Sequence, residues 1–323
     1  RWRQLLKMNT MMKRNFYWSA ITALLIFFTG HHLRAQTPSD AIMMKGKQAC
    51  VLLDYNFSSF DHYWEGDFKR DNQTIGTVRR HSIMPMMAIG ILNDLNFYAG
   101  VPHISTSSSN PNGGKFAGVS GFQDLTLALK YRWLNKELNK GHISSFATVG
   151  FSTPISNYLS DYMPYSLGFG APELSTRAII QYETSNSFYV RAAGTYVWKG
   201  YTEAEREYYY NNGSYFTPWM DVPSAITAEF VLGKWLLDKS LQLEISYWGQ
   251  NSLSGDDIRA YNAPQPTNQV NMHRIGLFAH YFFKSVPGLG IVAYHNRVIH
   301  GRNAPEFRTV GAGVTYFFNY RNK

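Results

Sequence analysis

The chain has 323 residues, 45% of them hydrophobic, and a formal charge of +9. That length suits either two ordinary domains or one large all-β barrel. Six of the 31 Lys and Arg residues lie in the first 35 positions, where there is no acid, so the rest of the chain carries 25 basic and 22 acidic residues. Because this remainder is nearly balanced and has no basic run longer than a pair, nucleic acid is excluded as a partner.

The aromatic content is high and the cysteine content is minimal. Tyr, Phe and Trp make up 16% of the chain, with 22, 21 and 8 residues respectively. Aromatic residues favour strands and interfaces between polar and apolar media. The single cysteine, Cys50, excludes a disulfide framework and a zinc–cysteine cluster. We expect no metal and no other cofactor.

The N-terminal 35 residues have the parts of a secretory signal. The basic pair Lys13-Arg14 precedes an apolar run from Phe16 to Phe28, and the small Ala35 follows. The run is too short for a stable membrane helix. We predict that residues 1–35 are a signal peptide with some upstream sequence, that cleavage falls near Gln36, and that residues 36–323 form a single domain.

Candidate strands recur along the whole domain, and no later run approaches the roughly 20 apolar residues that a membrane helix needs. The predicted strands are at about 47–60, 79–91, 95–105, 121–134, 142–153, 171–183, 188–199, 222–235, 241–251, 269–284, 289–300 and 306–319. There are about twelve, an even number, as a closed barrel with both termini on one side requires.

The predicted strand at 121–134 alternates strictly between apolar residues and mainly polar ones. Every second residue is apolar (Leu125, Leu127, Leu129, Tyr131, Trp133), and Asp124, Thr126, Ala128, Lys130 and Arg132 lie between them. A half-buried strand of a soluble sandwich would show the same alternation. In a membrane barrel the leucines face lipid and the charges face a wet lumen, because only a closed sheet satisfies its backbone hydrogen bonds in lipid.

The connections between the strands favour the membrane barrel over the sandwich. Short turns near 93–94, 135–141, 184–187, 237–240 and 286–288 alternate with long polar segments such as DHYWEGDFKRDNQTIG and YTEAEREYYYNNGSYFTPWM. Outer-membrane barrels have brief periplasmic turns and extended outer loops, whereas sandwich loops obey no such rule. We also expect an aromatic girdle at the short-turn side, formed by Tyr131, Trp133, Tyr182, Trp235, Tyr281, Phe283, Tyr316 and Phe318, with Tyr196, Trp198 and Tyr247 at the opposite rim.

One part of the sequence resembles a known family. Val101-Pro102 ends one strand, Gly121 to Leu125 opens the next, Lys130-Tyr131-Arg132 lies within it, and Pro154 ends the strand after that. This succession, clear over about 95–155, resembles the outer-membrane barrels called the meta-pathway of phenol degradation family. The resemblance implies an exported barrel and a channel for small or aromatic compounds, and it supplies no catalytic residues.

Reading the outward faces by apolar parity leaves a charged set facing inward. The lumen-lining candidates are Asp124, Lys130, Arg132, Glu173, Arg177, Arg191, Lys199, Glu229, Glu244 and Arg274, with His280. Parity places Glu173 opposite Lys199, Arg177 opposite Thr195, and Glu229 near Glu244. Such a set is either a group of ion pairs that fill a narrow lumen or a selectivity filter. With Trp248, Phe278 and Phe282 also inward, the lumen would suit an amphiphilic or aromatic solute.

Two other classes of function stay open. Some outer-membrane barrels are lipid hydrolases, for which His142 and Ser144 share a strand face, whereas the neighbours His81 and Ser82 point to opposite faces. A closed barrel could also serve as an anchor or assembly partner. We predict a non-enzymatic antiparallel transmembrane β-barrel in the outer membrane of a Gram-negative bacterium. Its expected partners are outer-membrane lipid, a small-molecule solute and, during biogenesis, the barrel-assembly machinery.

Overall fold

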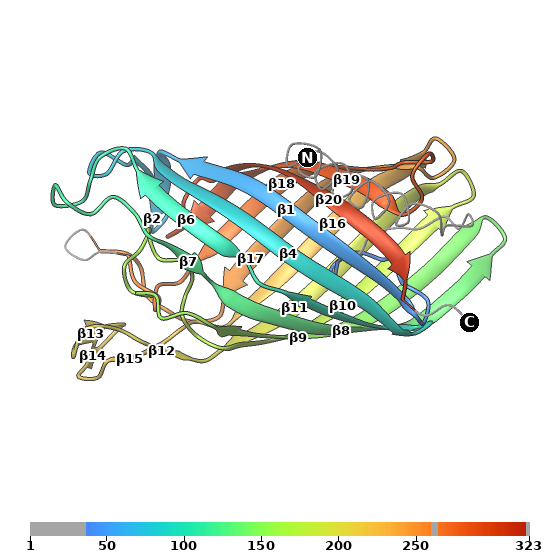
Figure 1. The fold of residues 1–323 in the computed structure, drawn as a ribbon. Coiled ribbons are helices and arrows are strands. Elements are labelled where there is room, and N and C mark those ends of the chain that lie inside the picture. Colours follow the sequence, from blue (N-terminus) through green and yellow to red (C-terminus); the bar gives the residue numbers. More distant parts are fainter. Residues whose placement is uncertain (1–36, 260–263, 321–323) are drawn as a thin grey trace, which may run out of the picture. The chain divides into compact units, whose positions relative to one another are not determined.

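An antiparallel sheet that closes on itself forms the wall of the protein in the computed structural model, which describes residues 37–259 and 264–320 (Figure 1). Its strands are β1 (Gln48–Phe60), β4 (Val78–Leu92), β5 (Leu95–Gly100), β6 (His103–Ser108), β7 (Ser120–Phe122), β8 (Asp124–Leu138), β9 (Gly141–Pro154), β10 (Glu173–Thr184), β11 (Phe188–Lys199), β16 (Ala225–Leu236), β17 (Leu241–Ser252), β18 (Asn271–Phe282), β19 (Leu289–Arg302) and β20 (Arg308–Asn319). The predicted signal peptide lies outside the described residues.

The sheet closes because β1 pairs with β20 on one side and with β4 on the other. We call each strand position around the wall a stave. β5 and β6 pair with successive parts of β4 and together form one interrupted stave, and β7 and β8 form the next. The described residues therefore form the predicted barrel of twelve staves. The strand predicted at 95–105 breaks at Val101-Pro102, the strand end that the family resemblance implied, where proline has no N–H to donate. The break at Gln123, before β8, was not predicted.

Short and long connections alternate, as the sequence predicts. Between β4 and β5, β8 and β9, β10 and β11, β16 and β17, and β18 and β19 the turns are short, and we call that end of the barrel periplasmic. The long connections at the extracellular end contain hairpins of their own: β2 (His62–Glu65) with β3 (Phe68–Asp71), β12 (Tyr201–Glu203) with β15 (Trp219–Asp221), and β13 (Tyr209–Tyr210) with β14 (Ser214–Tyr215).

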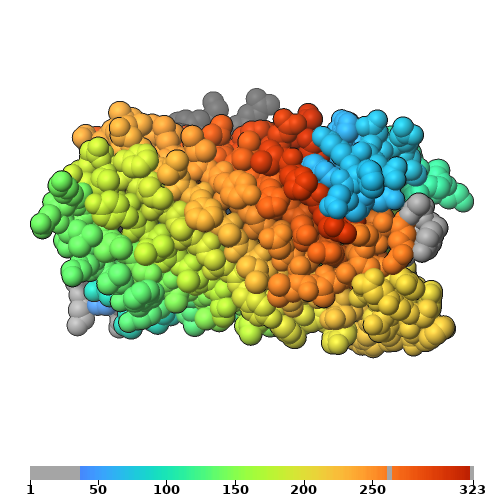
Figure 2. Space-filling model, turned by 180° about the vertical axis from the view of Figure 1, so that it is seen from behind, coloured from blue at the N-terminus to red at the C-terminus, as the bar shows by residue number. Residues whose placement is uncertain are grey.

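The outer wall is apolar, and seen from behind it is an unbroken surface (Figure 2). Large hydrophobic side chains such as Leu53, Ile83, Val149, Leu232 and Ile245 are exposed on it. A soluble protein would bury such a band, whereas lipid solvates it. The protein therefore has the exterior of a transmembrane barrel. Among the described residues, no helix is both long and apolar enough to cross a bilayer.

One member of the predicted periplasmic girdle points the other way. Trp235 is only 4% exposed and packs with Tyr189 and Val231 inside the barrel. On β16 the exposed series ends at Lys234, so Trp235 belongs to the inward series. The expected place of Trp235 in the lipid-facing girdle was therefore wrong, and Trp235 shares the inward face that parity assigned to Glu229. Tyr131 and Trp133, in contrast, are more than half exposed on the outer face.

A buried carboxylate ties the β2–β3 hairpin to the connection between β19 and β20. Glu306 accepts hydrogen bonds from Lys69 Nζ at 2.6 Å and Arg297 Nη2 at 2.9 Å. Burial acts to raise the pKa of Glu306, but the bonds from Lys69 and Arg297 outweigh it, so the pKa lies below its ordinary value of 4.5. A carboxyl whose pKa is lowered by folding stabilises the fold above the unfolded pKa and loses that contribution as the pH falls through the folded one.

We therefore expect the hairpin at 62–71 to loosen as the pH falls below about 4.5. Hydrogen exchange of this segment, measured in detergent between pH 7 and pH 3, should show protection that is lost at the acid end. Glu306→Gln should be less protected at pH 7 and should lose the dependence on pH. Equal acid sensitivity in both proteins would mean that another group controls the hairpin.

Candidate functional site in the barrel lumen

A buried bidentate ion pair lies in the periplasmic third of the lumen, four residues into β11 and β17. Arg191 Nη1 and Nη2 donate to the two carboxylate oxygens of Glu244 at 2.9 and 3.1 Å, and both side chains are buried. Tyr189 donates to Glu244 Oε1 at 2.6 Å, and Gln242 donates to both Tyr189 and Glu244. Every oxygen of the buried carboxylate is thus satisfied, which is the condition under which a buried ion pair is tolerated.

A glycine on the strand between them allows this pair to form. Arg191 and Tyr189 lie on β11, Glu244 lies on β17, and β16 separates the two strands. Gly233 of β16 lies opposite both Tyr189 and Glu244, and a Cβ added there would come within 2.2 Å of the Tyr189 ring. The missing side chain leaves the space through which Tyr189 reaches the carboxylate.

A second, more open ion pair joins β10 to β16. Arg177 Nη1 lies 3.4 Å from Glu229 Oε2, and each side chain keeps about a fifth of its surface exposed. The expected proximity of Glu229 and Glu244 was wrong, because the register puts Glu229 opposite Trp248 and Glu244 opposite Gly233. Four residues of strand separate the two levels, roughly 13 Å.

The remaining candidates are distributed along the length of the barrel. Glu173 lies opposite Lys199, and Arg177 opposite Thr195, which confirms the predicted pairings. The Lys199 Nζ to Glu173 distance is 3.5 Å. Asp124, at the extracellular end, accepts a 2.6 Å hydrogen bond from Tyr158. Arg132 binds Asp94 in a periplasmic turn, so it is a rim residue rather than part of the central lumen.

Arg274 differs from the other arginines of the middle lumen. Its guanidinium carbon lies 4.9 Å from the centre of the Trp248 ring. Among the described residues, no carboxylate lies within ion-pair distance of it. A cation over an aromatic face is stabilised by the ring quadrupole and remains able to bind an anion.

A segment that the sequence did not reveal as part of the site fills the periplasmic half of the lumen. Residues 37–44 precede the first strand, and Lys130 Nζ donates to Thr37 O at 3.0 Å and to Asp40 O and Asp40 Oδ1, both at 2.9 Å. The Lys130 side chain has no exposed surface. Thr148 adds a hydrogen bond to Pro38 O. Lys130 is therefore the anchor of this segment.

Apolar contacts complete the seat of residues 37–44. Ile42 packs against the inward cluster of Tyr189, Val231 and Trp235, and Met44 is 1% exposed. Gly90 of β4 allows the chain to approach, since a Cβ there would come within 2.1 Å of Lys45 O. Parity assigns residues to faces of strands and is silent about an irregular segment. The one sequence signal was a glycine within a strand, which often marks a close backbone approach.

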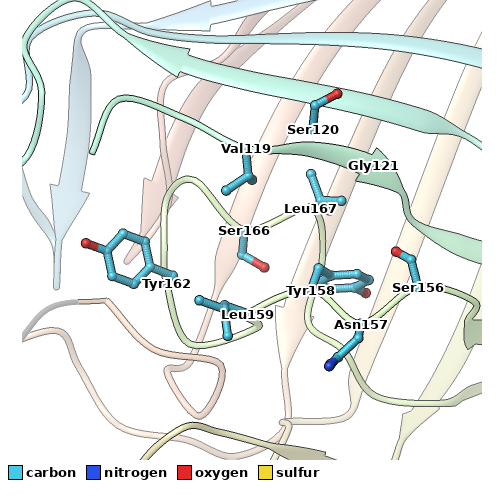
Figure 3. A pocket seen from close by; sticks show the side chains of 10 residues that line it. All are labelled: Val119, Ser120, Gly121, Ser156, Asn157, Tyr158, Leu159, Tyr162, Ser166 and Leu167. Carbon is cyan, nitrogen blue, oxygen red and sulfur yellow. The ribbon is translucent and has the colours of Figure 1, made fainter. Parts of the chain in front are cut away.

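At the extracellular end an irregular segment takes the place of missing wall (Figure 3). β9 ends at Pro154 and leaves one edge of β7 without a strand. Ser156 donates to Phe122 O at that edge, and Tyr165 O, further along the segment, accepts from the inward-facing Thr106. Ile155 N donates to Gln123 O at 3.2 Å, and the inward-pointing Arg80 donates to the carbonyls of Ser166 and Leu167. A cavity of about 270 Å³ remains, lined among others by Val119, Gly121, Tyr158, Leu159, Tyr162 and Leu167.

The geometry offers no hydrolase constellation at the histidines considered. His142 Nε2 bonds to the amide oxygen of Asn135 at 2.6 Å, and Ser144 on the same strand is buried. His81 Nδ1 bonds to the Tyr55 hydroxyl at 2.9 Å. Neither histidine has the carboxylate that a triad uses to orient its base. The described residues also hold no group of three His, Cys, Asp or Glu side chains that could bind a metal ion.

Residues 89–318 match the family described as "Putative MetA-pathway of phenol degradation". The chain belongs to this family. Its matched range runs from β4 to β20 and includes all ten charged candidates, and it begins after the segment at 37–44. No curated protein matches the sequence.

Two solved structures of outer-membrane proteins are similar to this chain to different degrees. The COG4313 outer membrane channel from Pseudomonas putida F1 is 15% identical, with a TM-score of 0.70 over 88% of this chain and 100% of that one. The translocator domain of the autotransporter NalP from Neisseria meningitidis is 12% identical, covers 96% of each chain and has a TM-score of 0.45. The first of these establishes that this chain has the fold of an outer-membrane barrel.

Proposed function

We propose that this family member is an outer-membrane channel for small solutes, with amphiphilic or aromatic compounds as the favoured class. The observation that carries the proposal is the contrast between an apolar exterior and a charged interior along the same strands. Arg274 over Trp248 offers an aromatic face and a cation without a carboxylate partner among the described residues. That combination suits an aromatic solute bearing a negative charge. The name of the Pseudomonas protein as a channel supports the same proposal.

In this proposal residues 37–44 close the periplasmic half of the lumen, and solute passage requires that they move. Lys130 holds them with three hydrogen bonds, and Ile42 holds them by packing. Residues 37–44 then have two states, seated in the lumen and released from it. A bound ligand or the membrane potential can shift the balance between such states. The last strand, β20, with Val310, Val314 and Tyr316 on its outer face, would be the part recognised by the barrel-assembly machinery.

The test is reconstitution of the protein in planar bilayers. We expect discrete conductance steps, with long closed periods that reflect the segment at 37–44. Uptake of a small aromatic acid into liposomes then tests whether a solute passes through the protein too slowly to give a measurable current. A silent bilayer together with impermeable liposomes would overturn the channel and leave the closed barrel as an anchor or assembly partner.

Ion selectivity should change in opposite directions when the two members of the open ion pair are neutralised. Glu229→Gln leaves the charge of Arg177 facing the lumen and should raise the preference for anions, whereas Arg177→Gln should raise the preference for cations. The measurement is the reversal potential in a salt gradient. Lys234→Gln, on the outer face, is the matched control and should change nothing. If both lumen variants had the same reversal potential as the unaltered protein, a selectivity filter at this ion pair would be excluded.

A further inference from the structure

Three arginines lie in one row across four neighbouring strands, on the outer face of the barrel at its extracellular end. Arg297 of β19 is opposite Arg308 of β20, Arg308 is opposite Ser59 of β1, and Ser59 is opposite Arg79 of β4. All three arginines are exposed. Neighbouring strands are about 4.8 Å apart, so the row spans roughly 14 Å of the surface. We call these three residues the arginine row.

The row lies just above the apolar band of the wall. On β20 the outward residues after Arg308 are Val310, Ala312, Val314, Tyr316 and Phe318, and on β4 the outward residues after Arg79 are His81, Ile83, Pro85 and Met87. The ten residue steps from Arg308 to Phe318 extend about 33 Å along the strand, or about 25 Å along the barrel axis at the usual tilt. That equals the height of a lipid-facing band. The arginine row is therefore at the level of the outer-leaflet headgroups.

The charge of the row is only partly balanced by the protein. Arg297 shares the carboxylate of Glu306 with Lys69, and Asp61 is close enough to Arg308 to interact with it electrostatically. Four cations thus stand near two carboxylates. Among the described residues, Arg79 and Arg308 have no ion-pair partner. Like charges directly opposite on neighbouring strands repel one another, so Arg297 and Arg308 are favoured together when an anion lies between them.

The row is confined to one side of the barrel. At the extracellular end of the far side, the outward residues in register are Phe151, Leu174 and Trp198 on β9, β10 and β11, and the neighbouring outward residue of β16 is Ile226, opposite Tyr196. None of these is basic. Beneath the row, the ring of His81 lies 5.0 Å from that of Phe57, and its Nδ1 bonds to Tyr55. Aromatic rings of this kind occupy the boundary between headgroups and acyl chains.

We propose that the arginine row binds the phosphate groups of a phosphorylated glycolipid of the outer leaflet, with its acyl chains along the apolar faces of β1, β4 and β20. Phosphate is the anion for which clustered guanidinium groups are best suited, because each can donate two parallel hydrogen bonds. The row presents guanidinium groups over a length that lets a headgroup with two phosphates bind more of them than a single phosphate can. Bound glycolipid would then be held on the side of the barrel formed by β19, β20, β1 and β4.

The test compares the protein with a variant in which all three arginines become glutamine, R79Q/R297Q/R308Q. Both are purified in detergent, and thermal unfolding is followed as diphosphoryl lipid A, monophosphoryl lipid A or inorganic phosphate is added. We expect diphosphoryl lipid A to raise the unfolding temperature of the unaltered protein by several degrees, the monophosphoryl form to act more weakly, and the variant to lose at least tenfold in apparent affinity. Native mass spectrometry should show the lipid retained by the unaltered protein alone.

A second triple variant controls for the loss of net charge. K136Q/K140Q/K234Q removes three exposed lysines at the periplasmic end, and it should bind the lipid as the unaltered protein does. Equal binding by R79Q/R297Q/R308Q and the unaltered protein would overturn the proposal. Equal stabilisation by inorganic phosphate at the same concentration would assign the row to free phosphate and overturn the lipid. If R79Q/R297Q/R308Q fails to fold, the single variants Arg79→Gln and Arg308→Gln decide by the same measurements.

Discussion

Replacing Lys130 with methionine should open the channel. The ammonium group makes three hydrogen bonds to residues 37–40, and nothing else in the described lumen anchors that part of the chain by charge. Hydrogen bonds of a charged group contribute on the order of 1.5–3 kcal/mol each, and methionine recovers some of the buried apolar contact. A net loss of about 3 kcal/mol shifts a two-state population roughly 100-fold. We expect the open probability in planar bilayers to rise by at least tenfold.

The outer-face variant Lys234→Met controls for the loss of a lysine near the same end of the barrel, and its recordings should match those of the unaltered protein. Deletion of residues 37–43 should reproduce the effect of Lys130→Met. A Lys130→Met channel that opens no more often than the unaltered one would show that the segment at 37–44 is not the barrier to conduction.

Neutralising Glu244 should produce the largest loss of stability of any single lumen substitution. Glu244→Gln leaves the Arg191 guanidinium enclosed without its counter-charge, while Tyr189 and Gln242 lose a charged acceptor. Breaking a buried ion pair by removing one partner costs about 3–5 kcal/mol. We expect the temperature at which the folded barrel converts to the slower-migrating unfolded form on a gel to fall by about 10 °C.

Two comparisons isolate the cause of that loss. Asp238→Asn removes an exposed carboxylate paired with the exposed Lys284 and should leave the conversion temperature unchanged, because exposed pairs contribute little. The double substitution Arg191→Met with Glu244→Leu removes both charges and should recover most of the stability. A double variant as unstable as Glu244→Gln would show that packing at this level, not the stranded charge, determines the loss.

The wall of the barrel was predictable because a strand in lipid repeats one physical contrast every two residues. That contrast located the staves within a few residues and placed Glu173 opposite Lys199. The error at Trp235 came from placing strand-end aromatics in a lipid-facing girdle: Trp235 packs inside, on the face that the same contrast assigned to the lumen through Glu229. The vertical positions of Glu229 and Glu244 follow from the strand register, which the turn between β16 and β17 fixes and which parity alone does not specify.

The parts of the site that parity could not reach are irregular segments. Lys130 was predicted as a lumen residue, yet its partners at Thr37 and Asp40 lie 90 or more residues away in a stretch without periodicity. The same holds for Arg80, whose carbonyl partners at Ser166 and Leu167 lie in the segment that covers the edge of β7. Contacts between a strand and a distant loop follow from packing in three dimensions, which composition and spacing do not encode.

The seat of residues 37–44 is joined to the wall by a very short tether. Only residues 45–47 separate the segment from β1, and Lys45 and Lys47 are themselves bonded to Gln48 and Gly90 at the periplasmic rim. Three extended residues reach about 10 Å. Once released, residues 37–44 therefore stay close to the lumen of their own barrel, at a high effective concentration. Re-closure is then a first-order reaction. Its rate constant does not depend on the density of barrels in the membrane, so each channel closes independently of the others.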